Sequence, residues 1–310
     1  MPTPSAGVDL YRAILARRSV RRYDQEPLDQ ATLAEVQEIA AGPMPLIPDN
    51  RMDVTLRDDV VRRDIVALLG AYGRLITPPH ALVPYIRGSP LSPASGTFRP
   101  PRGQGGGTSH LLEDLGYRVE QIAVGLAALG IGSCYLGTLP REEKARALLG
   151  VPADARIGAL LAFGRPAETA GGRALNGVVR SVLGRDQHPA LERFFFRDSL
   201  DNPSQPPAAL DRLVAAAAHA PSACNAQPWR FLWRDGQLWL FVTRNNRKYG
   251  GGASEQYCLY DGGIAMANIS LAAQASGIPA EWQMVETADA NIPPHPTELH
   301  PIARLVMSEH

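Results

Sequence analysis

The chain has 310 residues, enough for one large domain or two modest domains with a substantial hydrophobic core. Its 31 Lys and Arg residues balance 31 Asp and Glu residues, so the formal net charge is zero. A neutral chain gives no electrostatic reason to expect nucleic acid or an anionic membrane as a partner.

Cysteine and histidine usage gives no sign of a disulfide framework or a metal site. The three cysteines, Cys134, Cys224 and Cys258, form an odd set without a CxxC pair. The seven histidines are scattered without the spacing of zinc ligands. A reduced, cytoplasmic protein without a metal is the expectation. The first ten residues lack the pattern of a signal peptide, and no apolar run approaches the roughly 20 residues of a spanning helix.

Apolar spacing in the first 165 residues alternates between helical and strand-like patterns. The helix expected at 29–41 begins at an Asp29 or Thr32 N-cap and is broken at Gly42-Pro43. The long segment 110–130 has the composition of a buried helix. In chain order, the patterns predict helices at 9–18, 29–41, 60–76, 110–130 and 141–150, and strands at 51–58, 80–86, 134–139 and 156–164.

Two segments carry no periodicity. Residues 87–107 are rich in Pro, Gly and Ser, and a loop of this length in a compact domain is either a lid or a floppy insertion. Both interpretations stay open. Residues 167–185 are weakly patterned and form the expected linker between two halves.

The order of elements recurs past this linker. The helix "DLGYRVEQIAVGLAALGI" begins at Asp114 and "DGGIAMANISLAAQASGI" begins at Asp261, and in this alignment Gln121 faces Asn268. Upstream, "RRSVR" aligns with "RFFFR", and "RIGALLAFG" resembles "PIARLVMS" near the end of the chain. A chance match between alanine-rich helices is the alternative. We predict two similar halves, 1–185 and 186–310, packed as a pseudo-dimer about an approximate two-fold axis.

Three short motifs lie in these halves. "RRSVRRY" follows the first predicted helix, "ALGIGSCYLG" covers 128–137, and "APSACNAQPWRF" covers 220–231 after an alanine-rich helix. Together they resemble the nitroreductase family. The resemblance implies an α+β fold, FMN as cofactor, NAD(P)H as co-substrate, and a flavin held between subunits. The two-half arrangement is similar to the branch in which both halves are fused, which includes flavin-sequestering members.

The resemblance also implies a set of flavin-binding residues from both halves. The first half supplies the arginine segment and the backbone expected beside flavin N5, and the second half supplies the "PSxxN" loop. Arg173, in "GGRALN", is a further candidate for phosphate binding, although its spacing departs from the family. The implied residues are Arg17, Arg18, Ser19, Arg21, Leu136, Gly137, Arg173, Pro221, Ser222 and Asn225.

Departures from the family pattern favour one site rather than two. The second half has Phe195 where the first has Ser19, and the first half has "GPMPLIPDN" where the second has the serine-containing loop. The intact motifs therefore lie in opposite halves, as one composite site requires. We expect one FMN per chain.

The residue chemistry suits this cofactor, although plainer interpretations stay open. Guanidinium groups offer forked donors that match phosphate oxygens, and Ser19 adds a hydroxyl. The arginine cluster could instead close a helix, and Ser222 could be an ordinary turn residue. Gln227 and Trp229 are expected to be structural, and Cys224 is not expected to be a nucleophile.

The sequence therefore predicts an FMN-dependent oxidoreductase that takes hydride from NAD(P)H and reduces a nitroaromatic- or quinone-like acceptor. Because the flavin would carry the reaction, no catalytic side chain is predicted. The alternatives are a flavin-storage protein, a biosynthetic flavin-dependent dehydrogenase that needs no nicotinamide, and a scaffold with both sites lost. The expected state is a monomeric pseudo-dimer or a weak homodimer.

Overall fold

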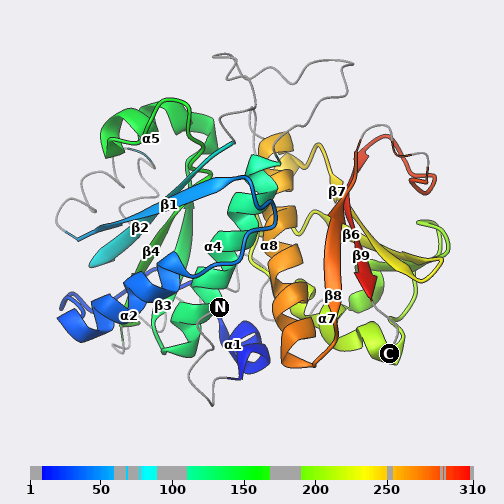
Figure 1. Ribbon diagram of the computed structural model, residues 1–310, viewed down its shortest axis with the longest axis horizontal. Coiled ribbons are helices and arrows are strands. Elements are labelled where there is room, and N and C mark those ends of the chain that lie inside the picture. The colour runs from blue at the N-terminus through cyan, green and yellow to red at the C-terminus, as the bar shows by residue number, and fades with distance from the viewer. Residues whose placement is uncertain are drawn as a thin grey trace.

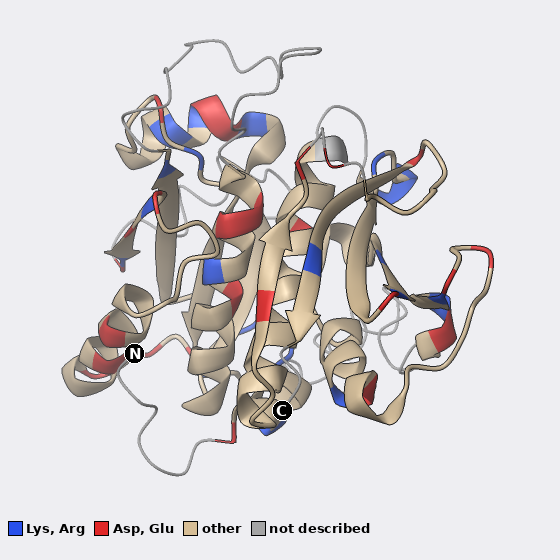
Figure 2. Cartoon of the chain, turned by 45° about the vertical axis from the view of Figure 1, so that its right-hand side comes forward, with Lys and Arg blue, Asp and Glu red and all other residues tan. Residues whose placement is uncertain are grey.

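The computed structural model describes residues 9–58, 68, 76, 78–88, 110–167, 190–249, 254–286, 289 and 291–307. Two long helices, α4 (Leu111–Ala128) and α8 (Ser254–Ala275), run side by side through the centre. One β-sheet lies on each side of this helix pair (Figure 1). Figure 2 shows acidic and basic positions interspersed along both halves, as the zero net charge suggests.

The first sheet contains four strands in the order β1-β2-β4-β3, and every neighbouring pair is antiparallel. The patterns predicted helices α1, α2, α4 and α5 and all four strands to within a few residues. The Asp29 side chain accepts a hydrogen bond from the Thr32 amide, which confirms the predicted N-cap. The bounds are α1 Leu10–Ala16, α2 Gln30–Ala41, β1 Arg51–Arg57, β2 His80–Arg87, β3 Gly132–Gly137, α5 Glu142–Leu149 and β4 Ala159–Gly164.

The second sheet contains five strands in the order β5-β6-β7-β9-β8. Without β5, its order and its antiparallel pairings are those of the first sheet, with β6, β7, β9 and β8 replacing β1, β2, β4 and β3. The predicted internal duplication is therefore present in the sheets. The bounds are β5 Phe195–Arg197, α7 Ala208–Ala218, β6 Trp229–Arg234, β7 Gln237–Thr243, β8 Ala280–Met284 and β9 Leu299–Met307.

Glycines allow the two central helices to touch backbone to backbone. A Cβ atom on Gly116 would lie 2.1 Å from the carbonyl oxygen of Tyr260, and one on Gly263 would lie 2.0 Å from that of Glu113. Gly263 follows Gly116 by the same interval as Tyr260 follows Glu113, so the two contacts are equivalent. Reciprocal contacts of this kind are the mark of a two-fold interface. The two halves thus pack as an intrachain pseudo-dimer.

One predicted correspondence is wrong in space. Ser19 forms a parallel bridge with Ser133 at the β3 edge of the first sheet. Phe195, its predicted counterpart, lies in β5 and pairs with Phe231 of β6, at the opposite edge of the second sheet. The short strand β5 is buried there, where Phe194 and Phe195 are fully enclosed in the core. The "RFFFR" segment is therefore not a degenerate copy of the arginine segment at the equivalent position.

Several sequence predictions lie outside the described residues. These are most of the helix expected at 60–76, the loop 87–107 beyond Gly88, the linker 167–185 beyond Ala167, and the boundary between 185 and 186. In the part of the chain that the structure does describe, no helix has the length and apolarity needed to cross a membrane.

Candidate functional site

The loop at 221–227 has a backbone that only a well-supported structure can hold. Cys224, Asn225 and Gln227 have φ angles of 52°, 53° and 47°, in the left-handed region that non-glycine residues seldom adopt. The Ser222 hydroxyl oxygen accepts a hydrogen bond from the Gln227 amide at 2.9 Å. Ser222 therefore does act as a turn residue, and Trp229, fully buried at the start of β6, is structural as predicted. Strained backbone of this kind concentrates at binding sites.

Asp261 of α8 anchors this loop. Its carboxylate accepts hydrogen bonds from the Ala223 amide, at 3.0 and 3.2 Å, and from the Tyr249 hydroxyl at 2.7 Å. Asp114, its counterpart in α4, accepts a bond from the Leu46 amide at 2.8 Å. Each central helix therefore holds a loop that follows a shorter helix of its own half, α2 in the first half and α7 in the second. This equivalence supports the predicted pairing of "GPMPLIPDN" with the "PSxxN" loop.

The arginine segment leads from the end of α1 toward the edge of β3. Arg17 and Arg21 are buried, whereas Arg18 is exposed. Arg18 donates hydrogen bonds to the carbonyl groups of Leu15 and Arg17, so it closes α1 as the plainer interpretation proposed. Ser19 is partly buried. Val20 continues the pairing with β3, because its backbone amide donates a hydrogen bond to the Ser133 carbonyl oxygen.

The arginine segment reaches the second half through Arg17. Its Nη2 donates to the carbonyl oxygen of His219 at 3.3 Å, and His219 is the C-cap of α7, three residues before Ser222. The structure therefore brings the arginine segment of one half to the helix end from which the "PSxxN" loop of the other half departs.

A second contact crosses the seam at the end of β3. A Cβ on Gly137 would lie 2.4 Å from the hydroxyl oxygen of Tyr257, which belongs to α8. Tyr257 stacks on Tyr249 with ring centroids 5.5 Å apart, and Tyr249 bonds to the loop anchor Asp261. Both ends of the first-half site thus contact second-half elements that support the loop.

Not every predicted site residue is available in the predicted way. The Leu136 side chain is buried in the first-half core, so only its backbone could face a ligand. At Gly137 the Tyr257 side chain lies where a Cβ atom would be in close contact with it, and the sequence did not indicate this contact. Arg173 lies outside the described residues. Pro221 is buried, and Asn225 is partly exposed beside Lys248, whose ammonium donates to the Asn225 carbonyl at 3.2 Å.

Sequence reasoning missed a buried polar cluster behind Arg17. Glu120 of α4 is fully buried, with its Oε1 3.4 Å from Arg17 Nε, and its Oε2 accepts a bond from the Tyr135 hydroxyl at 2.7 Å. Burial raises the pKa of Glu120 to about 7, although Arg17 and the side chains of Tyr135 and Asn268 favour the ionised form. The signal that could have revealed the cluster was the presence of a glutamate, Glu120, in a helix whose composition indicated burial.

The residues present fit a phosphate-bearing flavin. Arg17 has its Nε against Glu120 and its Nη2 on His219, while its Nη1 meets no acceptor among the described residues. That nitrogen, with Ser19 and Arg21 two and four residues on, provides cationic and hydroxyl donors of the kind that phosphate accepts. In the same described residues, no group of three or more His, Cys, Asp and Glu side chains could hold a metal ion.

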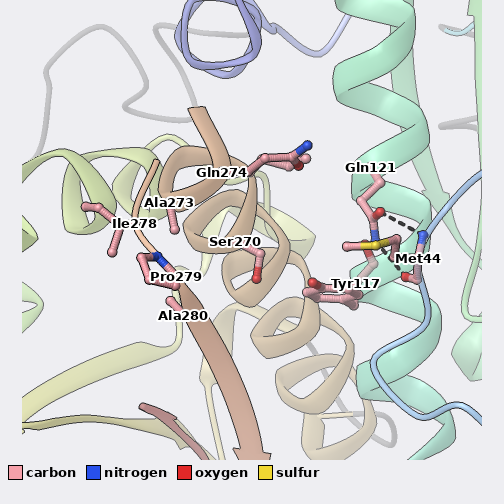
Figure 3. Close-up of a pocket in the computed structure, with 10 residues that line it drawn as sticks. Met44, Tyr117, Gln121, Ser270, Ala273, Gln274, Ile278, Pro279 and Ala280 are labelled. Atoms are coloured by element: carbon pink, nitrogen blue, oxygen red, sulfur yellow. Dashed lines mark hydrogen bonds between the residues drawn. The ribbon is translucent and has the colours of Figure 1, made fainter. Parts of the chain in front are cut away.

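The approximate two-fold axis relates the candidate FMN site to a second position on the other side of the helix pair, and the two positions have different residues. A cavity of about 230 Å³ lies between Met44 of the first half and 278–280 of the second (Figure 3). Pro279 and Ala280 are the counterparts of Gly132 and Ser133, which the segment Ser19–Val20 covers in the first half. Because β5 lies at the far edge of its sheet, no arginine segment among the residues that the structure describes covers this second position. The Gln121 amide, which exchanges two hydrogen bonds with the Met44 backbone, borders the cavity instead.

Comparison with solved structures defines the class of fold. A crystal structure from Thermotoga maritima MSB8, described as a "putative nitroreductase", superposes with a TM-score of 0.53 at 16% identity, covering 96% of this chain and 93% of that one. The fold is therefore the α+β fold of a nitroreductase over nearly the whole chain. Nitroreductase A from Vibrio parahaemolyticus covers 52% of this chain and 69% of its own, with a TM-score of 0.42 at 20% identity. An FMN-dependent nitroreductase from Clostridium difficile R20291 covers 52% of this chain and 88% of its own, with a TM-score of 0.38 at 17% identity.

The sequence itself assigns the family. Residues 104–273, more than half of the chain, match the family described as "Putative TM nitroreductase". The chain belongs to this nitroreductase family, as its three motifs suggested.

Proposed function

We propose that this protein is an FMN-dependent oxidoreductase that takes hydride from NAD(P)H and reduces a small oxidised acceptor of nitroaromatic or quinone type. The observation that carries the proposal is the seam at which Arg17, from one half, bonds to the helix end that precedes the "PSxxN" loop of the other half. Family membership adds to this support. Bound FMN would supply the ring that accepts and passes on the hydride.

The residues of the chain would bind and orient the cofactor. Arg17 and Ser19 would hold its phosphate with charged and hydroxyl donors. Arg21, buried two residues further on, would favour the negative charge that the ring gains on reduction. Asn225, fixed in its left-handed conformation by the Asp261-anchored loop, would hydrogen-bond the ring edge or the ribityl chain.

One FMN per chain follows from the asymmetry of the two positions. Among the described residues only the first half has an arginine segment beside its β3 edge, and in the sequence only the second half has the serine-containing loop. The opposite position carries Met44, Pro279 and a cavity lined mainly by neutral side chains. Because the seam within the chain replaces a subunit interface, we propose that a single chain suffices for the site, with at most a weak homodimer.

The test is an absorbance spectrum followed by rapid mixing with nicotinamides. The purified protein should be yellow, or become so with added FMN, and NADH or NADPH should bleach the flavin before an added quinone or nitroaromatic restores the colour. A protein that stays yellow but is reduced by neither nicotinamide would contradict the proposed turnover and favour flavin storage or a dehydrogenase with another donor. A protein that remains colourless with FMN would contradict the cofactor itself.

A further inference from the structure

Glu120 is a charged side chain that only one of the two halves possesses. It lies in α4, and its counterpart at the same helical position in α8 is Ala267. Arg17, the partner of Glu120, also lacks a spatial counterpart among the described residues, because the second-half segment forms β5 at the far edge of its sheet. In the part of the chain that the structure describes, the pair therefore exists only on the side of the proposed FMN site.

The surroundings of Glu120 leave Arg17 as its counter-ion. Tyr135 of β3 donates to Oε2, the Asn268 amide of α8 lies beside the carboxylate, and the Tyr260 ring of α8 packs nearby. Burial is the main cause that raises the pKa of both Tyr135 and Tyr260 well above its ordinary value, so both phenols are neutral. Among the described residues around Glu120, only Arg17 supplies a full positive charge, and its Nε lies 3.4 Å from Glu120 Oε1.

A phosphate dianion on Arg17 would place a second anion against the same guanidinium. Two anions that share one cation away from water destabilise each other. A proton on the carboxyl group relieves the repulsion while the hydrogen bond with Tyr135 can persist, because a phenol both donates and accepts. The phosphate has no such option above its own second pKa of roughly 6.

We infer that Glu120 is the internal counter-ion of Arg17 and is protonated from solvent when the phosphate of FMN binds that guanidinium. The inference rests on the proposed function, since FMN must bind at the seam. A pKa of about 7 for the unliganded carboxyl group means that a modest upward shift changes its protonation at neutral pH. FMN affinity then weakens as the pH rises, because an ionised Glu120 competes with the phosphate for Arg17.

The test is calorimetric titration of the full-length, flavin-free chain with FMN at about pH 7.5, in two buffers of different ionisation enthalpy. If binding raises the pKa of Glu120 by about one unit, FMN should take up about 0.5 proton per chain. Between about pH 7 and pH 9 the affinity should fall roughly five-fold. Riboflavin, which lacks the phosphate, should bind without this uptake.

Substitution separates Glu120 from other titrating groups. Glu120→Gln should abolish both the proton uptake and the pH dependence, and should bind FMN at pH 9 at least as tightly as the wild type. Glu113→Gln, which alters another buried glutamate of the same helix, should retain both effects. Uptake that persists in Glu120→Gln, or wild-type binding without uptake, would overturn the inference while leaving the cofactor assignment intact. A wild-type chain that binds no FMN would instead contradict the proposed function.

Discussion

The backbone contact between α4 and α8 predicts that an added methyl group at either crossing glycine destabilises the protein. In Gly116→Ala the new Cβ would lie 2.1 Å from the Tyr260 carbonyl oxygen, and in Gly263→Ala 2.0 Å from that of Glu113. Ordinary contact distances are above about 3 Å, so the helices must separate by about 1 Å, and a gap of that size forfeits a quarter to a half of each dispersion contact.

The magnitude follows from opposing effects. Overpacking a core costs about 1–3 kcal/mol and occasionally more, whereas alanine gains about 1 kcal/mol over glycine in a helix interior. Because both clashing partners here are backbone atoms that cannot rotate away, the overpacking cost should lie at the upper end of this range, and we expect a net loss of about 2 kcal/mol in unfolding free energy for each variant. The double variant should lose less than the sum, because one separation of the helices relieves both clashes.

Chemical denaturation of the variants measures this loss, with Gly262→Ala as the matched control. At that neighbouring position the Cβ would meet the Ile302 and Val242 side chains rather than backbone, and the nearest atom is the terminal Cδ1 of Ile302. The control should therefore lie much closer to the wild type. Gly116→Ala and Gly263→Ala variants as stable as Gly262→Ala would refute the reciprocal helix crossing.

Two further predictions concern buried carboxylates. The pKa of Glu120 is raised from 4.5 to about 7 in the folded state, so its unfavourable ionisation is absent at low pH and grows as the pH rises through that window. Wild-type unfolding free energy should therefore fall by about 2–3 kcal/mol relative to Glu120→Gln between pH 5 and pH 8, and parallel pH profiles would contradict this. Asp261→Asn should loosen the "PSxxN" loop and weaken FMN retention at least ten-fold. A ten-fold change corresponds to about 1.4 kcal/mol, which is close to the cost of losing one hydrogen bond to a charged group. Asp114→Asn, which affects the opposite loop, should leave retention unchanged, and an equal loss in both variants would show that anchoring of this loop is not the cause.

Most local elements of the fold could be predicted from the sequence because their signals are local. The Asp29 cap, the apolar spacing of α4 and the alternating pattern of β1 each depend on neighbouring residues. The internal repeat could be recognised in the sequence because Asp114 and Asp261 recur at equivalent positions, and in the structure each accepts a hydrogen bond from a loop amide.

The sequence could not predict which of several possible strands or side chains a residue contacts when the two are far apart along the chain. A short apolar strand such as β5 fits either edge of a sheet, so the alignment of "RFFFR" with "RRSVR" did not reveal that it pairs with β6. The contact of Tyr257 with Gly137 and the ion pair of Glu120 with Arg17 likewise join residues more than 100 positions apart, and no local pattern marks them.

The most direct test of the composite site is the amount of FMN retained per chain by the wild type, Arg21→Ala and Asn225→Ala, measured by absorbance after gel filtration. The two substitutions lie in opposite halves, so Arg21→Ala leaves Asn225 unchanged and Asn225→Ala leaves Arg21 unchanged. The wild type should hold about one FMN per chain, a ratio that follows from the asymmetric seam, and both variants should lose most of it. Loss in only one variant, or two FMN per wild-type chain, would contradict a single site shared by the two halves.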